Sequence, residues 1–222
     1  MRIATLRAGR RFGVTLALAM SLAPLALATL PANPYTPESR QPPSAASRRI
    51  SDGQEADAPF GYIDFCMRFT DQCPFGSKQA EPVTTWRYWP QMVNINRRVN
   101  RAIKPESAIR HYGRYQYWNI PKDGLGDCAD YALTKRRDLA RAGIPLSDLN
   151  LAIVKLPTGE LHAVLVVSTA EGDFVLDNLH QRIRLWNRDG YVFLSIMSAQ
   201  SPTQWVKVVP RSRNRIFANA LR

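Results

Sequence analysis

The chain has 222 residues, of which 30 are Lys or Arg and 18 are Asp or Glu, so its net charge is +12 with neutral histidines. Hydrophobic residues make up 45% and charged residues 22% of the chain. These proportions are ordinary for a folded globular protein and exclude bulk disorder, collagen and coiled coil. The three cysteines are too few for a small scaffold held together by disulfides.

The first residues have the pattern of a secretory signal peptide. Residues 1–11 contain four arginines and no acid, and residues 12–28 are uncharged and mostly apolar. This run ends in Ala26-Leu27-Ala28, which is a small-x-small cleavage pattern. A membrane anchor is the alternative, but the run is short for a span of about 20 residues and contains Pro24. We therefore expect cleavage near Ala28, no stable membrane insertion afterwards, and a periplasmic or secreted mature protein.

Composition divides the rest of the chain into a tether and a domain. Residues 29–59 are rich in Pro, Ser and Ala and lack periodic apolar positions, which predicts a flexible tether. Residues 60–222 are predicted to form one globular domain. In an oxidising compartment Cys66 and Cys73 are close enough in sequence to form a local disulfide. Cys128 is then the odd cysteine, either a free reactive thiol or part of an intermolecular pair.

Two helices are predicted in the first half of the domain. A helix is expected over Met92–Ile109, where Pro105 breaks or restarts it. The residues at helical spacing are Val93, Asn96, Asn100 and Ile103. The second helix begins after Asp127, which is its N-cap, and Asp130 follows in the manner of a capping box. It ends before Gly143, a residue typical of the position that follows a helix.

After these helices the apolar pattern changes to a period of two, which predicts strands. The strands are expected at residues 149–154, 160–168, 174–179, 192–196 and 205–209, with polar turns between the first three. Helices followed by consecutive antiparallel strands predict an α+β fold.

Cys128 is predicted to lie in the first turn of the second helix. Helix N-termini present unpaired N–H groups and a partial positive charge, which stabilise a thiolate and can hold an oxyanion. A cysteine nucleophile also needs a base, and the base needs a group that orients it. The position of Cys128 is therefore that of a candidate nucleophile.

His162 and Asp177 are the candidate base and orienting group. They lie on consecutive predicted strands, and the midpoint between them falls within the polar turn 168–173. Neighbours across a hairpin are within contact distance, so a Cys-His-Asp triad agrees with the spacing. His180 and His111 are rival bases. From the residues alone, a structural role for each member of the triad stays open.

Three segments around these residues resemble the bacterial transglutaminase-like cysteine peptidases. They are Gly126-Asp127-Cys128-Ala129-Asp130-Tyr131-Ala132, Leu161-His162-Ala163-Val164-Leu165 and Phe174-Val175-Leu176-Asp177-Asn178. The resemblance covers roughly residues 59–186 and includes LapG-type periplasmic proteases, which release large adhesins from the outer membrane. It implies a papain-like/transglutaminase-like core in which the cysteine helix packs on an antiparallel sheet. It also implies that Cys128 is the nucleophile, His162 the general base and Asp177 its orienting group.

Calcium is the one cofactor that the resemblance raises. LapG-type enzymes look to need calcium that is bound by acidic residues on both sides of the catalytic cysteine. In this chain Asp127 is acidic, but Ala129 stands on the other side, and Asp130 is the next carboxylate. Hard cations prefer several oxygen ligands. We therefore expect no required cofactor, with Asp127 and Asp130 as the candidate ligands if calcium binds.

Further positions are candidates for a supporting role. Trp118, Asn178 and Asp130 are expected to line the substrate groove or to support the catalytic residues, although core packing is an equal alternative for Trp118. The basic residues near the C-terminus are interpreted as solvated, and no nucleic-acid motif is present in the sequence.

The sequence therefore predicts an exported cysteine endopeptidase that cleaves a protein substrate through a thioacyl-enzyme. The expected substrate is a protein, with envelope or surface proteins as candidates, and nucleic acid is not an expected partner. The alternatives are an acyl transferase of transglutaminase type and a catalytically idle binding module of the same fold. The sequence does not indicate an oligomeric state.

Overall fold

The computed structural model describes residues 50, 52–74, 83–198 and 201–209. The expected signal peptide, the tether up to residue 49 and most of the basic C-terminal residues lie outside this part of the chain. Among the described helices, none has the length and apolar character to cross a membrane.

A curved, seven-stranded antiparallel sheet forms one layer of the fold, in the order β1-β9-β8-β4-β5-β6-β7. Its strands are β1 (Asp52–Ala56), β4 (Leu149–Lys155), β5 (Leu161–Thr169), β6 (Gly172–Leu176), β7 (Arg184–Leu185), β8 (Val192–Ser198) and β9 (Ser201–Val208). A separate parallel pair joins β2 (Lys104–Pro105) to β3 (Leu125–Gly126).

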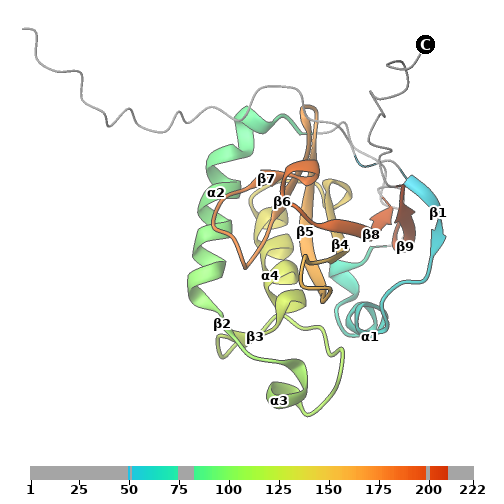
Figure 1. The fold of residues 1–222 in the computed structure, drawn as a ribbon. Coiled ribbons are helices and arrows are strands. Elements are labelled where there is room, and N and C mark those ends of the chain that lie inside the picture. The colour runs from blue at the N-terminus through green and yellow to red at the C-terminus, as the bar shows by residue number, and fades with distance from the viewer. Residues whose placement is uncertain (1–49, 51, 75–82, 199–200, 210–222) are drawn as a thin grey trace, which may run out of the picture. The chain divides into compact units, whose positions relative to one another are not determined.

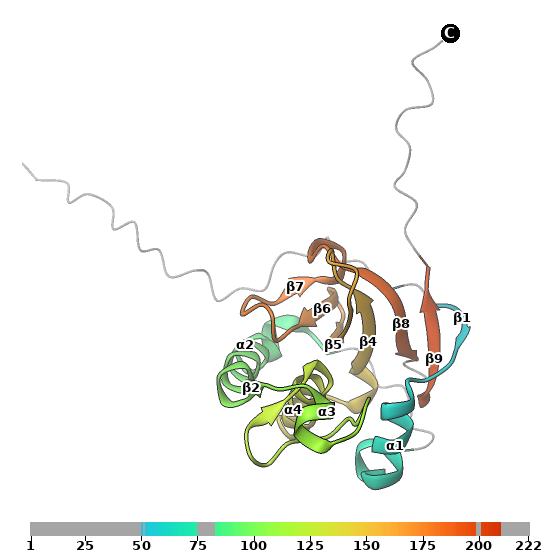
Figure 2. The same ribbon diagram turned by 60° about the horizontal axis from the view of Figure 1, so that its bottom comes forward.

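The helices lie on one side of this sheet (Figures 1 and 2). They are α1 (Phe60–Arg68), α2 (Thr85–Ala102), α3 (Ala108–Tyr112) and α4 (Cys128–Arg141), with short 3₁₀ turns at η1 (Thr70–Gln72), η2 (Leu146–Asp148) and η3 (Trp186–Arg188). The main core fills the space between α1, α2, α4 and the sheet, and a smaller core covers the other face. The α+β class is confirmed.

The helix α4 follows its sequence signals closely. Asp127 is the N-cap, and its side chain and that of Asp130 form the predicted capping box. At the other end Gly143 is left-handed, with φ +95°. The N–H of Gly143 donates to Ala140 O (3.0 Å) and that of Ile144 to Leu139 O (3.1 Å), which is a Schellman motif. Local chemistry therefore determines both ends of this helix.

Other boundaries were predicted less well. The helix expected at 92–109 is α2, which starts at Thr85 and ends at Ala102, and α3 is a separate element. Pro90 lies inside α2, where the ring removes one backbone hydrogen bond and obscures the helical pattern. The strand β1 lies inside the segment 29–59 that was predicted to be a tether. It pairs with β9, a partner far away in sequence, so the folded part includes residue 52.

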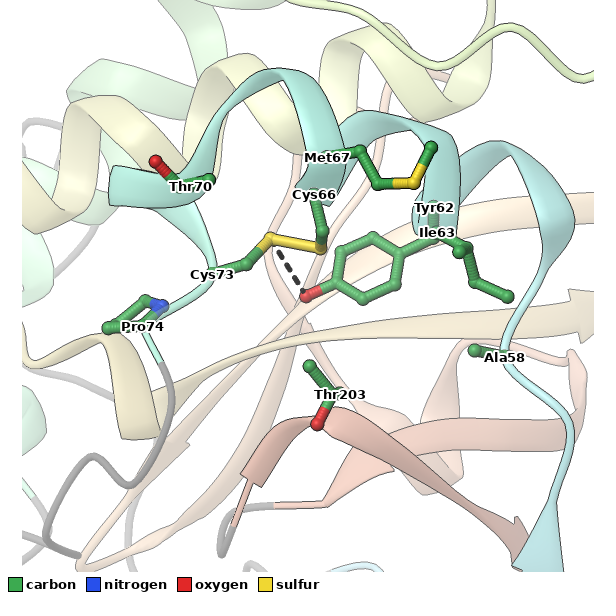
Figure 3. A pocket seen from close by; sticks show the side chains of 9 residues that line it. All are labelled: Ala58, Tyr62, Ile63, Cys66, Met67, Thr70, Cys73, Pro74 and Thr203. Carbon is green, nitrogen blue, oxygen red and sulfur yellow. Dashed lines mark hydrogen bonds between the residues drawn. A yellow bond between two sulfur atoms is a disulfide. The ribbon is translucent and has the colours of Figure 1, made fainter.

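The disulfide Cys66–Cys73 joins α1 to the residue after η1, as the spacing predicted. Figure 3 shows the Tyr62 hydroxyl directed at Cys73 Sγ, to which it donates at 3.6 Å. These residues and Thr203 of β9 line an apolar cavity of about 590 Å³.

Arg136 connects this disulfide segment to α4. Its side chain is 1% exposed. Nε donates to Leu149 O (2.9 Å) and Nη1 donates to Gln72 O (2.6 Å). One buried guanidinium therefore bonds carbonyls at the start of β4 and beside Cys73.

We predict that Arg136→Met lowers the free energy of unfolding by roughly 2–4 kcal/mol, because it removes two charge-assisted hydrogen bonds, one of them to the buried carbonyl of Leu149. Arg137→Met is the matched control, since Arg137 is partly exposed and pairs with the neighbouring Asp138. Exposed pairs contribute about 0–1 kcal/mol. Urea unfolding of the oxidised protein measures the free energy of unfolding of both variants. Equal effects of the two variants would contradict this role for Arg136.

Candidate active site

The capping box places Cys128 at the first residue of α4. Asp127 Oδ1 accepts from the N–H groups of Ala129 (3.0 Å) and Asp130 (3.3 Å), and Asp130 Oδ2 accepts from Asp127 N (3.3 Å). Cys128 is half-buried and takes no part in a disulfide. Its thiol therefore lies at the positive end of a fourteen-residue helix.

His162 and Asp177 form a buried pair. His162 Nε2 lies 2.8 Å from Asp177 Oδ1, and the two side chains are 6% and 3% exposed. The expected contact is present, although the strand register differs from direct opposition. Val166 pairs with Val175 and Leu165 with Leu176, so Asp177 follows the end of β6 and lies diagonally from His162. Diagonal neighbours across strands remain within contact distance for long side chains.

The surroundings of His162 favour its charged form. Burial alone would lower its pKa, but hydrogen bonds to Asp177 and Cys128, together with the charges of both groups, raise the pKa of His162 to about 9. Because Nε2 contacts Asp177, Nδ1 is the ring nitrogen that remains for the thiol of Cys128. The structure thus brings together all three residues of the predicted triad.

Asp177 is held from several elements. Its Oδ1 also accepts from Leu179 N (3.1 Å), and its Oδ2 accepts from the hydroxyl of Tyr191 (2.6 Å). Asn100 of α2 donates to the backbone carbonyl of Asp177 (2.9 Å). Burial would raise the pKa of Asp177, but the bonds from His162 and Tyr191 and the His162 charge hold it below its ordinary value.

Tyr191 is a member of the site that the sequence analysis missed. It lies between η3 and β8, and nothing in the local sequence marks a tyrosine there as part of a site. The antiparallel pairing of β8 with β4 brings it to Asp177.

Asp130 supports the fold around Cys128 and does not line the groove. It is 0% exposed. Oδ1 accepts from Asn119 N (2.7 Å), and Oδ2 accepts from the hydroxyl of Tyr112 (3.1 Å). Burial and the nearby charge of Asp127 raise the pKa of Asp130 to about 7. Both carboxylate oxygens of Asp130 therefore accept hydrogen bonds from backbone or side-chain donors.

A pocket of about 380 Å³ opens beside Cys128. Its lining comes from the ends of β2 and β3, the segment after β2, the start of α4 and Asn178. The residues are Pro105, Glu106, Ser107, Arg110, Gly126, Asp127, Cys128, Tyr131 and Asn178. Asn178, one of the candidate groove residues, thus lines the pocket beside Cys128. Trp118 does not: it is 6% exposed and packs edge-on against Tyr62 in the main core.

The two rival histidines have other neighbours. His180 stacks on Tyr191, with ring centroids 6.2 Å apart. His111 Nε2 lies 2.7 Å from Asp123 Oδ2, and the His111 ring lies against that of Tyr112 at a tilt of 32°. Among the residues with described positions, His162 is therefore the histidine that combines a buried carboxylate partner with Cys128.

The candidate calcium ligands do not fit a calcium ion. A hard cation takes six to eight oxygen ligands. Asp130 is fully buried with both oxygens accepting hydrogen bonds, and Asp127 Oδ1 accepts from two backbone amides. Within the described part of the chain, no group of three or more His, Cys, Asp or Glu side chains is arranged to hold a metal.

Comparison with known proteins shows what this chain is similar to. Solved structures of LapG from Legionella pneumophila are similar to this chain. The EGTA-treated form is 24% identical, with a TM-score of 0.47 over 56% of this chain and 69% of that chain. The calcium-bound form is 22% identical, with a TM-score of 0.45 over 56% of this chain and 73% of that chain. No curated protein sequence matches significantly.

A family model described as bacterial transglutaminase-like cysteine proteinase matches residues 52–213, which is most of the chain. The start of this match coincides with the first residue of β1. The chain therefore belongs to the bacterial transglutaminase-like cysteine proteinases.

Proposed function

We propose that this peptidase is an exported cysteine endopeptidase in which Cys128 is the nucleophile, His162 the general base and Asp177 its orienting group. The buried hydrogen bond between His162 and Asp177, next to a free cysteine at a helix N-terminus, carries the proposal. The signal-like residues 1–28 support export. An exported enzyme meets envelope or surface proteins, so we place its substrate among them.

The first half of the reaction forms a thioacyl-enzyme. The thiolate of Cys128 attacks the carbonyl carbon of the peptide bond. The backbone N–H of Cys128 has no intrahelical partner at the first position of α4, so it can donate to the resulting oxyanion. When the C–N bond breaks, the leaving amine takes a proton from His162 Nδ1.

The second half releases the acid. His162, now neutral, accepts a proton from water as the oxygen attacks the thioester carbon. The C–S bond breaks, and the thiolate and the imidazolium are restored. Throughout both halves Asp177 accepts from Nε2, so it keeps the imidazole oriented and stabilises its charge.

We expect Cys128→Ala and His162→Ala each to lower turnover by at least about 1,000-fold, because each removes a group that acts in every bond change. Turnover is measured by mass spectrometry on a peptide library from a bacterial envelope fraction. His180→Ala is the matched control, and it is expected to keep activity of wild-type order. Retained hydrolysis in Cys128→Ala would overturn the assignment.

We expect the reactivity of Cys128 to depend on His162 below neutral pH. The His162 imidazolium, whose pKa is raised to about 9, carries its positive charge next to Cys128 below that pH. A neighbouring positive charge makes a cysteine more reactive. Iodoacetamide should therefore modify wild type at pH 6 at least about tenfold faster than His162→Ala. Intact mass should show one adduct, because Cys66 and Cys73 are disulfide-bonded. An inert Cys128 would instead favour the idle binding module.

We infer that the activity needs no calcium. The carboxylates nearest the cysteine are used by the capping box, and Ala129 offers no side-chain ligand. A site with a Kd 100-fold below the calcium concentration would stabilise the protein by about 2.7 kcal/mol. We expect neither Tm nor activity to differ between EGTA and calcium chloride. A rise in Tm that Asp127→Asn abolishes would contradict this.

A further inference from the structure

Both oxygens of the Asp177 carboxylate accept hydrogen bonds, and one of the donors is the hydroxyl of Tyr191, which takes no part in the bond changes of the reaction. On Oδ1 the donors are His162 Nε2 (2.8 Å) and Leu179 N (3.1 Å). On Oδ2 the donor is the hydroxyl of Tyr191 (2.6 Å). A carboxylate only accepts, so the tyrosine hydroxyl must be the donor. The Tyr191 bond therefore acts on the carboxylate oxygen opposite the one that contacts His162.

The position of Tyr191 is itself held by its surroundings. Its N–H donates to Asp189 Oδ1 (3.2 Å), and its ring packs against the smaller core. The ring also lies edge-on to His162, with centroids 6.0 Å apart at 79°. The preceding residue, Gly190, has φ +85°, a conformation that L side chains rarely adopt. The turn thus presents the hydroxyl in a defined place.

We propose that Tyr191 is a positioning residue that holds the Asp177 carboxylate in the rotamer and charge state that orient His162. This inference rests on the proposed function, since it assigns Tyr191 an effect only through that pair. A buried carboxylate with a donor on each oxygen cannot rotate without breaking a charge-assisted bond. When the Tyr191 donor is removed, Oδ2 is left buried and unpaired, which favours rotation or protonation of Asp177.

Several other charged groups surround Asp177 and must stay constant in a test. Lys135 of α4 is 0% exposed, and its charge interacts with that of Asp177. Asp189 interacts with Asp177 from the segment before β8, and Arg184 of β7 acts on Tyr191 and Asp189. Tyr191→Phe changes none of these groups and keeps the ring packing. It removes only the hydroxyl.

The test follows the pH dependence of Cys128 alkylation by iodoacetamide in the full-length mature protein. Loss of the His162 imidazolium produces the upper step of this profile. In Tyr191→Phe a less well held Asp177 stabilises the imidazolium less, so the upper step should move to lower pH by about one unit, the order expected for one hydrogen bond to a charged group. Tyr88→Phe is the matched control, because Tyr88 donates to Gly143 O (3.3 Å) away from the site.

A double-variant cycle shows whether the effect passes through Asp177. Asp177→Asn should shift the upper step in the same direction, and adding Tyr191→Phe to it should cause no further shift. The proposal would be overturned if the upper step of Tyr191→Phe stayed at the wild-type pH or moved to higher pH while Tm was unchanged. It would also be overturned if Tyr191→Phe shifted the step equally in the wild-type and the Asp177→Asn protein. If wild-type Cys128 shows no step that depends on His162, the proposed function fails instead, so the two failures are distinguishable.

Discussion

The position of Cys128 depends on one buried carboxylate, that of Asp130. It closes the capping box with Asp127 and accepts from Asn119 N and the Tyr112 hydroxyl, so it joins the start of α4 to the segments before it. A buried carboxyl group without such donors would be costly. The same bonds that satisfy Asp130 therefore help to determine where α4, and with it Cys128, begins.

Several buried ionisable groups lie around His162. His162, Asp177 and Asp189 are buried, and so is Lys135, whose charge interacts with that of Asp177. Burial lowers the pKa of Lys135 to about 7. Such groups add little net stability, but they keep their neighbours in defined charge states. Ionisable groups with such perturbed pKa values are typical of functional sites.

Elements with strong local signals were predicted well from the sequence. The predicted ends of α4 agree with the structure because the capping box and the left-handed Gly143 depend only on residues next to the helix. The predicted fold class agrees with the structure because the spacing of apolar residues changes from a helical period to the alternation typical of strands. In α2 the prediction began too late, since Pro90 interrupts the pattern while packing against α4 still supports a helix. The strand β1 was missed because its partner β9 is far away in sequence.

By itself, the sequence predicted the α+β class, a cysteine at a helix N-terminus, a local disulfide and a contact between His162 and Asp177. These follow from interactions between residues that are close along the chain. Only the tertiary structure decided that this pair meets diagonally, that Trp118 packs in the core and that Tyr191 donates to Asp177. Register, packing and a third donor depend on contacts between distant segments, and no local pattern of residue types encodes them.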